Sequence, residues 1–234
     1  MRKHLFTISI IVNLCFLVLV IRHYVLMPGK PSSRSLSYFV NRNVLLRGLP
    51  KDTTDILFVG DSQFQGFEAS ELFGSVKFKN RGIYYDTSKG LLNRIEDLAI
   101  GLPHIIFIEI GINDLQNGVP LDTVYNNLNK TVNIIKAKSP RTIVCIQSVL
   151  PIKKTFGEKP QSLEKNRLLL NKMYLILAEK HNADFINLDQ YFLAEGLNSK
   201  YDVGDGIHLN AAGYFKWTEV LRNHLSLSPA IQPH

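Results

Sequence analysis

Two kinds of hydrophobic pattern alternate along most of the chain. The first consists of short, continuous apolar runs, which are typical of buried strands, at 55–61, 75–83, 104–111, 142–151 and 183–189. The second has apolar residues every three or four positions, as on one face of a helix, at 87–100, 121–137, 162–181 and 211–225. Strands that are apolar on both faces and separated by helices indicate a parallel sheet covered on both sides. We therefore expect an α/β fold.

The first 50 residues follow a different pattern. Residues 5–21 are 17 consecutive uncharged and mostly apolar positions behind a basic start. Extended to Met27, residues 5–27 are long enough to span a membrane as one helix. No small-x-small cleavage site follows the run, which favours an uncleaved signal anchor over a cleaved signal peptide. We therefore expect residues 1–27 to be a single-pass anchor in the cytoplasmic membrane, with the folded domain on the outer, periplasmic or extracellular, face.

The other boundaries follow from composition. Residues 28–34, PGKPSSR, are rich in Pro, Gly and Ser, which is typical of a linker. The apolar positions between 36 and 46 partly fit a helix laid against the domain. We expect a folded domain at 35–227 and a frayed tail at 228–234.

The net charge of +7 comes entirely from residues 1–50, which hold seven basic and no acidic residues. The rest of the chain balances 20 basic against 20 acidic residues, whereas a nucleic-acid-binding domain carries its basic excess on the folded part. Basic residues that flank an apolar segment favour a membrane surface instead. We therefore expect a membrane partner and no nucleic acid. The two cysteines, Cys15 and Cys145, do not have the spacing of metal ligands.

Polar residues follow the carboxyl ends of the predicted strands, where ligands of parallel sheets bind. Ser62 follows the first strand, and a serine becomes a nucleophile when a base takes its proton. His208 is the natural base, and Asp205, three residues before it, can orient its ring. The backbone N–H groups of Ser62 and Gly82 and the side-chain amide of Asn113 are candidates for an oxyanion hole. Together these residues predict acyl-transfer chemistry.

Three more polar residues at this edge are candidates for contacting substrate. Gln147 and Ser148 lie towards the carboxyl end of the fourth predicted strand and are expected in the wall of the pocket. Arg81 precedes Gly82 and can either reach substrate or form a structural ion pair.

Four short motifs occur in the order GDS (60–62), NRG (80–82), GIND (111–114) and DGIH (205–208). They resemble the four blocks of the SGNH, or GDSL-type, hydrolases, and the resemblance spans residues 55–225. The stretches IFIEIGINDL, QSVLP and DGIHLNAAGY are similar to the branch related to platelet-activating-factor acetylhydrolase. The resemblance implies a three-layer, flavodoxin-like α/β/α sandwich with a five-stranded parallel sheet.

The same resemblance implies ester hydrolysis through an acyl-enzyme, with Ser62, Asp205 and His208 as catalytic residues and with no cofactor or metal. It also implies an oxyanion hole formed by Ser62, Gly82 and Asn113. Gln63-Phe64 follows the serine where the family often has Ile or Leu and then Thr, a departure that we expect to affect pocket shape more than chemistry. Tyr84-Tyr85 is bulkier than usual, which suggests an aromatic-lined pocket.

Other functions remain alternatives at this point. Transfer of the acyl group to a sugar hydroxyl uses the same residues as hydrolysis. A noncatalytic binding module would be expected to lack one of these residues, yet all are present. A metal-dependent phosphoesterase sharing Asp61, Asp114, Asp205 and His208 is disfavoured because such sites use several histidines. We expect a short, acetyl-like acyl group on a small molecule, lipid or glycan, and the sequence specifies no oligomeric state.

Overall fold

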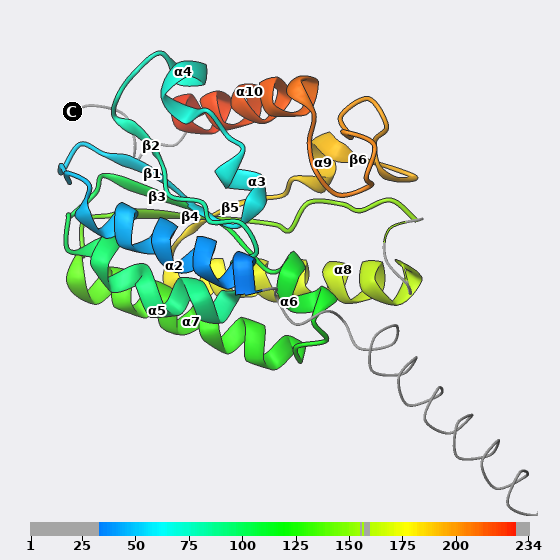
Figure 1. Ribbon diagram of the computed structural model, residues 1–234, viewed down its shortest axis with the longest axis horizontal. Helices are drawn as coiled ribbons and strands as arrows, with labels where there is room; N and C mark the ends of the chain where they lie inside the picture. The colour runs from blue at the N-terminus through cyan, green and yellow to red at the C-terminus, as the bar shows by residue number, and fades with distance from the viewer. Residues whose placement is uncertain (1–32, 155, 157–159, 228–234) are drawn as a thin grey trace, which may run out of the picture. The chain divides into compact units, whose positions relative to one another are not determined.

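The computed structural model describes residues 33–154, 156 and 160–227 (Figure 1). The chain divides into two compact units, Met1–Tyr38 and Phe39–His234. The expected anchor at 1–27 and tail at 228–234 lie outside the described residues, as does the linker except for its last two residues, where helix α2 (Ser33–Gly48) begins. Within the described residues, no helix combines the length and apolar character needed to cross a membrane.

Five parallel strands form the central sheet in the order β2-β1-β3-β4-β5. Their bounds are Ile56–Gly60 (β1), Phe78–Asn80 (β2), Ile105–Glu109 (β3), Ile143–Gln147 (β4) and Asp184–Ile186 (β5). The predicted parallel sheet is therefore confirmed. The fourth strand is shorter than its apolar run, because the chain leaves the sheet after Gln147 and residues 148–151 have no regular secondary structure.

Helices cover both faces of the sheet, which confirms the predicted three-layer sandwich (Figure 1). One face carries α5 (Ser88–Ala99), α7 (Leu121–Lys138) and α8 (Pro160–His181). The other carries α4 (Ala69–Phe73) and α10 (Ala211–Leu227). Each face has its own hydrophobic core, because successive strand residues point to opposite sides.

Strand β1 shows this alternation clearly. Leu57 and Val59 pack in the core beneath α5, α7 and α8, whereas Phe58 packs in the aromatic core beneath α10. There Phe58 stacks on Phe107 of β3 with ring centroids 5.2 Å apart. The continuous apolar runs of the sequence therefore reflect burial on both faces.

Short helices begin at the carboxyl ends of two central strands. Helix α3 (Ser62–Gln65) starts two residues after β1, and α6 (Ile112–Gln116) starts three residues after β3. Both carry candidate site residues in their first turn. A further short helix, α9 (Asp189–Phe192), leads into the two-stranded hairpin of β6 (Leu193–Ala194) and β7 (Gly196–Leu197).

Candidate active site

Ser62, His208 and Asp205 form a continuous hydrogen-bonded chain, although 146 positions separate Ser62 from His208. The Ser62 hydroxyl oxygen lies 3.0 Å from His208 Nε2. On the other side of the ring, His208 Nδ1 lies 2.6 Å from Asp205 Oδ2. A hydroxyl, an imidazole and a carboxylate in this order have the geometry of a nucleophile, its base and the group that orients the base.

Asp205 also binds the backbone of the loop that carries the histidine. Its Oδ1 accepts hydrogen bonds from the backbone N–H groups of Ile207 at 3.0 Å and His208 at 2.9 Å. Partial burial acts to raise the pKa of Asp205, but these bonds and the one from the His208 ring outweigh burial and hold that pKa below its ordinary value. The carboxylate therefore stays ionised and fixes the imidazole.

A second aspartate stabilises the same loop. Asp202 accepts hydrogen bonds from the backbone N–H groups of Gly204 at 2.8 Å and Gly206 at 3.0 Å, and it pairs with Lys153 at 2.5 Å. Gly204 and Gly206 have φ values of +117° and +84°, a region that favours glycine. These contacts fold the loop so that His208 faces Ser62.

Two N–H donors remain available beside the serine. Ser62 is the first residue of α3, so its backbone N–H has no acceptor within the helix. Asn113 is buried in α6 and uses one of its two amide hydrogens in a 2.9 Å bond to the backbone carbonyl of Asp86. The second amide hydrogen is available to a developing oxyanion.

Known proteins resemble this chain in sequence and in fold. Residues 58–215 match the model of the GDSL-like Lipase/Acylhydrolase family. This match covers more than half of the sequence. The chain belongs to the GDSL-like lipase/acylhydrolase family. It is accordingly an ester-bond hydrolase. The comparison with curated proteins found no match to its sequence.

Solved structures share the GDSL-like fold. A Streptococcus pneumonia protein, provisionally described as a platelet activating factor, is 26% identical with a TM-score of 0.71, over 81% of this chain and 93% of that one. A GDSL-like lipase from Bacteroides thetaiotaomicron is 23% identical with a TM-score of 0.68, over 80% and 95%. An acetylxylan esterase from Geobacillus stearothermophilus is 16% identical with a TM-score of 0.60, over 79% and 99%.

In this GDSL-like hydrolase, the Gly82 N–H does not point to a free position as we expected of an oxyanion donor. Its backbone N–H donates to the side-chain oxygen of Asn80 at 2.7 Å, so this hydrogen is already used within its own turn. A Cβ at Gly82 would lie 2.6 Å from the carbonyl carbon of Phe64 and 2.9 Å from the carbonyl oxygen of Asp61. The glycine therefore allows close packing against the backbone of α3.

The expected substrate-binding roles of Gln147 and Ser148 are wrong. Both side chains are fully buried. Gln147 accepts a hydrogen bond from the Trp217 indole at 2.8 Å, and the Ser148 hydroxyl accepts one from the backbone N–H of Leu188 at 2.8 Å. They join the end of β4 to neighbouring elements, and neither side chain is accessible to substrate.

Arg81 also lies outside the site. Its side chain is buried, donates to the backbone carbonyl of Asn80 at 2.9 Å, and lines a small cavity with Asp55 and Pro103, which precede β1 and β3. It therefore points to the amino ends of the strands, away from Ser62. Of the two roles open to Arg81, the structure supports the structural one.

The side chain of Gln63 makes a contact to the His208 loop that the sequence did not predict. Its side chain is buried and donates to the backbone carbonyl of Ile207 at 2.6 Å. This bond connects the helix that starts at Ser62 to the loop that carries His208. Gln63 therefore positions two segments that are 144 positions apart in the sequence, and its effect on pocket shape stays a prediction.

Buried charged side chains hold the turns around Ser62 and Asn113 in place. Arg94 pairs with Asp86 at 2.8 Å and donates to the backbone carbonyls of Arg81 and Gly60 at 2.9 and 3.1 Å. Asp114 accepts two hydrogen bonds from Ser88, one from its backbone and one from its hydroxyl. These partners hold the segment whose Asp86 carbonyl positions Asn113. The sequence offered no signal for the Arg94 contacts, which span up to 34 positions.

Two unusual acids lie beneath the site. Asp61 and Glu109 are fully buried, and one oxygen of Asp61 and both of Glu109 have no hydrogen-bond partner within the described residues. Burial, together with the charges of Asp86 and Asp114, raises the pKa of Asp61 to about 7. Burial and the charge of Asp61 raise the pKa of Glu109 well above its ordinary value. Burial therefore favours the neutral, protonated form of Glu109.

An exposed aromatic pair stands at the rim. The rings of Tyr84 and Tyr85 lie 4.3 Å apart by centroid, and the Tyr84 ring lies 6.5 Å from the His208 ring at an angle of 23°. The two tyrosines are 39% and 53% exposed. Their rings are therefore accessible to a group bound beside His208.

Proposed function

We propose that this GDSL-like hydrolase is a serine esterase that removes short acyl groups, acetyl in particular, through an acyl-enzyme. The observation that carries the proposal is the chain from Ser62 through His208 to Asp205, with contacts of 3.0 and 2.6 Å. Both distances are within hydrogen-bond range before any substrate is bound.

In the first half-reaction, Ser62 Oγ attacks the acyl carbon while His208 Nε2 takes the hydroxyl proton. The Ser62 N–H and the second amide hydrogen of Asn113 stabilise the oxyanion, and each such donor is worth about 3 kcal/mol. Asp205 stabilises the imidazolium. The intermediate then collapses, and His208 gives its proton to the departing alcohol. In the second half-reaction, water attacks the acyl-enzyme by the same steps and releases the acid.

Solvent access favours hydrolysis over acyl transfer. The side chains of His208 and Asp205 are 30% and 46% exposed, so water can reach the base when the acyl-enzyme is formed. An acyltransferase needs to keep water away from that intermediate.

The acetyl preference is supported by the shared fold of the acetylxylan esterase and by the bulky tyrosines at the rim. The proposed anchor at residues 5–27 would keep the enzyme at the outer face of the cytoplasmic membrane, where acylated glycans and lipids are the natural carriers.

Hydrolysis of p-nitrophenyl acetate, butyrate and octanoate by the full-length chain in mild detergent tests the mechanism. Ser62→Ala and His208→Ala are each expected to lower kcat by about 1000-fold or more, since the nucleophile or its base is removed. Ser199→Ala, at an exposed serine outside the site, is the matched control and should retain activity. Folded variants that keep their turnover would overturn the proposal.

A further inference from the structure

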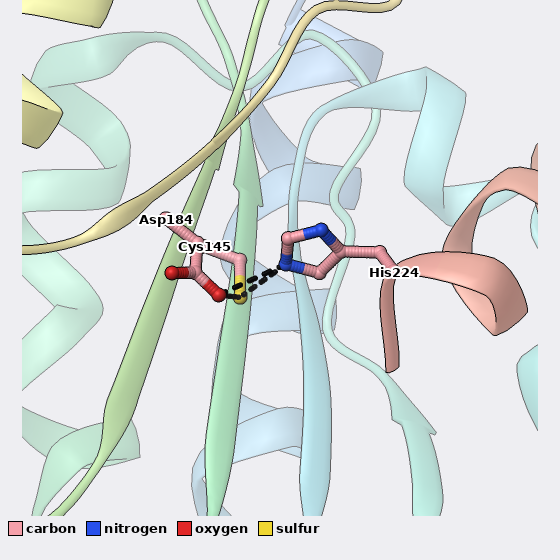
Figure 2. A group of neighbouring side chains, drawn as sticks. All are labelled: Cys145, Asp184 and His224. Atoms are coloured by element: carbon pink, nitrogen blue, oxygen red, sulfur yellow. Dashed lines mark hydrogen bonds and ion pairs between the residues drawn. The ribbon is translucent and has the colours of Figure 1, made fainter. Parts of the chain in front are cut away.

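A second group of reactive side chains lies on the α10 side of the sheet. Cys145 of β4, Asp184 of β5 and His224 of α10 point toward one another (Figure 2). The Cys145 sulfur lies 3.8 Å from both His224 Nε2 and Asp184 Oδ2, and the nitrogen and oxygen are 2.9 Å apart. Within the described residues, this is the one such group of three or more histidine, cysteine and acidic side chains.

These separations match three corners of a tetrahedral metal site. Zn²⁺ binds sulfur at about 2.3 Å and nitrogen or oxygen at about 2.0–2.2 Å, so donors around one ion are about 3.4–3.6 Å apart. The observed distances of 3.8, 3.8 and 2.9 Å need shifts of only a few tenths of an ångström. Thiolate, imidazole and carboxylate are also the donor types that zinc prefers.

The three residues come from packed elements. Cys145 and Asp184 are direct neighbours in the pairing of β4 with β5. The His224 ring packs edge-on against Phe107 of β3, with centroids 6.3 Å apart. The donors are therefore held before an ion arrives, which lowers the cost of ordering them.

The group is also accessible from one side. Cys145 is fully buried, whereas the side chains of His224 and Asp184 are 23% and 33% exposed. An ion can enter past the histidine and aspartate, meet the sulfur at the floor, and keep water as its fourth ligand. The partial exposure of these two side chains is what lets an ion arrive from solvent.

We propose that Cys145, Asp184 and His224 bind Zn²⁺ or a similar divalent ion, with water in the fourth position. The thiol loses its proton to solvent, and the His224 proton moves to Nδ1 so that Nε2 can bind. Thiolate and carboxylate then neutralise the two charges of the ion. Without metal, burial and the charge of Asp184 raise the pKa of Cys145 well above its ordinary value, so the same residues form an inert hydrogen-bonded cluster.

The proposed ion stabilises structure and takes no part in ester cleavage. Cys145 lies two residues before the end of β4, within the core beneath α10, whereas Ser62 lies beyond the end of β1. Binding would tie the last turns of α10 to the two strands. The inference is independent of the proposed esterase mechanism.

Titration with Co²⁺ is the test, since cobalt replaces zinc and reports its ligands by colour. Full-length protein stripped with a chelator is expected to bind one Co²⁺ with a sulfur-to-cobalt charge-transfer band and the visible bands of four-coordinate cobalt. Zn²⁺ should displace these bands and raise the melting temperature by about 5 °C at saturation. Cys145→Ala should abolish the sulfur band, and His224→Gln should weaken binding at least tenfold.

Cys15→Ala is the matched control because it removes the other cysteine of the chain, and it should bind cobalt like the wild type. Circular dichroism and melting establish that each variant is folded, and His224→Gln provides a second test if Cys145→Ala is unstable. The absence of a sulfur band in folded wild-type protein, or a band that persists in Cys145→Ala, would overturn the proposal.

Discussion

Tyr85 has a backbone φ of +62°, a conformation that residues with side chains rarely adopt. The strain costs on the order of 1–2 kcal/mol, and it occurs in the turn that presents Tyr84 beside His208. In the proposed mechanism His208 gives its proton to the leaving alcohol, which places the group attached to that alcohol near Tyr84. The tyrosine ring is therefore suited to contact the carrier of the acyl group.

Tyr84→Ala is expected to raise KM for acetates of aromatic alcohols or sugars by about 2- to 10-fold, with kcat nearly unchanged. The reason is the loss of one ring contact, worth about 0.5–1.5 kcal/mol, which substrate and transition state share. Steady-state kinetics with aryl acetates and an acetylated sugar provide the measurement. A fall in kcat at constant KM would argue against a contact with the carrier.

Gln63→Leu is expected to reduce kcat more than it changes KM. The substitution removes the hydrogen bond to the Ile207 carbonyl and leaves that carbonyl unpaired, which costs about 1–3 kcal/mol of folding stability. The same loss loosens the loop that carries His208. Urea unfolding and steady-state kinetics measure the two effects, and Gln190→Leu, at an exposed glutamine, is the control. Unchanged kcat in a destabilised variant would show that Gln63 is merely structural.

At the scale of elements, the carboxyl ends of β1 and β3 are adjacent and each holds a buried acid. Gly60 pairs with Glu109 in the sheet, and Asp61 directly follows Gly60. A folded-state pKa above the unfolded value means that the protonated acid stabilises the fold at low pH. This contribution declines as pH rises through the window from 3.8 to about 7 for Asp61.

Glu109→Gln should therefore stabilise the protein increasingly as pH rises. The amide cannot ionise in either state, so the variant avoids the stability that the wild type loses as pH rises, when the unfolded chain releases the Glu109 proton and the folded chain keeps it. We expect the difference in free energy of unfolding between variant and wild type to grow by about 1–3 kcal/mol between pH 5 and pH 8. Urea unfolding at both pH values measures it. A difference that is constant with pH would contradict the raised pKa values.

At the scale of the whole molecule, the two units have different roles in our proposal. The described residues carry the esterase site and the cysteine-containing cluster, whereas the apolar run at 5–21 lies outside them. The proposed anchor would restrict the enzyme to substrates at the membrane surface without altering its chemistry.

Deletion of residues 1–27 is expected to move the esterase from the membrane fraction to the soluble fraction. Turnover of p-nitrophenyl acetate should stay within about twofold, because the deletion removes none of the residues placed around Ser62. Ultracentrifugation and activity assays of both fractions provide the measurement. Activity that sediments with the membrane after the deletion would contradict the anchor.

The sequence by itself determined the order and type of the main elements, and it named the three residues that the structure joins by hydrogen bonds, Ser62, His208 and Asp205. Apolar runs predict buried strands and helical spacing predicts the covering helices, because both patterns depend on neighbouring residues. Ser62, Asn113, Asp205 and His208 could be named because each lies in a short motif directly after a strand or in a loop. The parallel arrangement then requires these segments to meet at one edge of the sheet.

Only the tertiary structure decided which way side chains and N–H groups point. The Gly82 N–H is used by Asn80, the Gln147 and Ser148 side chains are buried, and Arg81 points to the opposite end of the sheet. Gln63 and the cluster around Cys145 depend on partners 39 to 144 positions away. Spacing along the chain carries no signal for such contacts, because they arise from how separate elements pack and from which buried polar groups find partners.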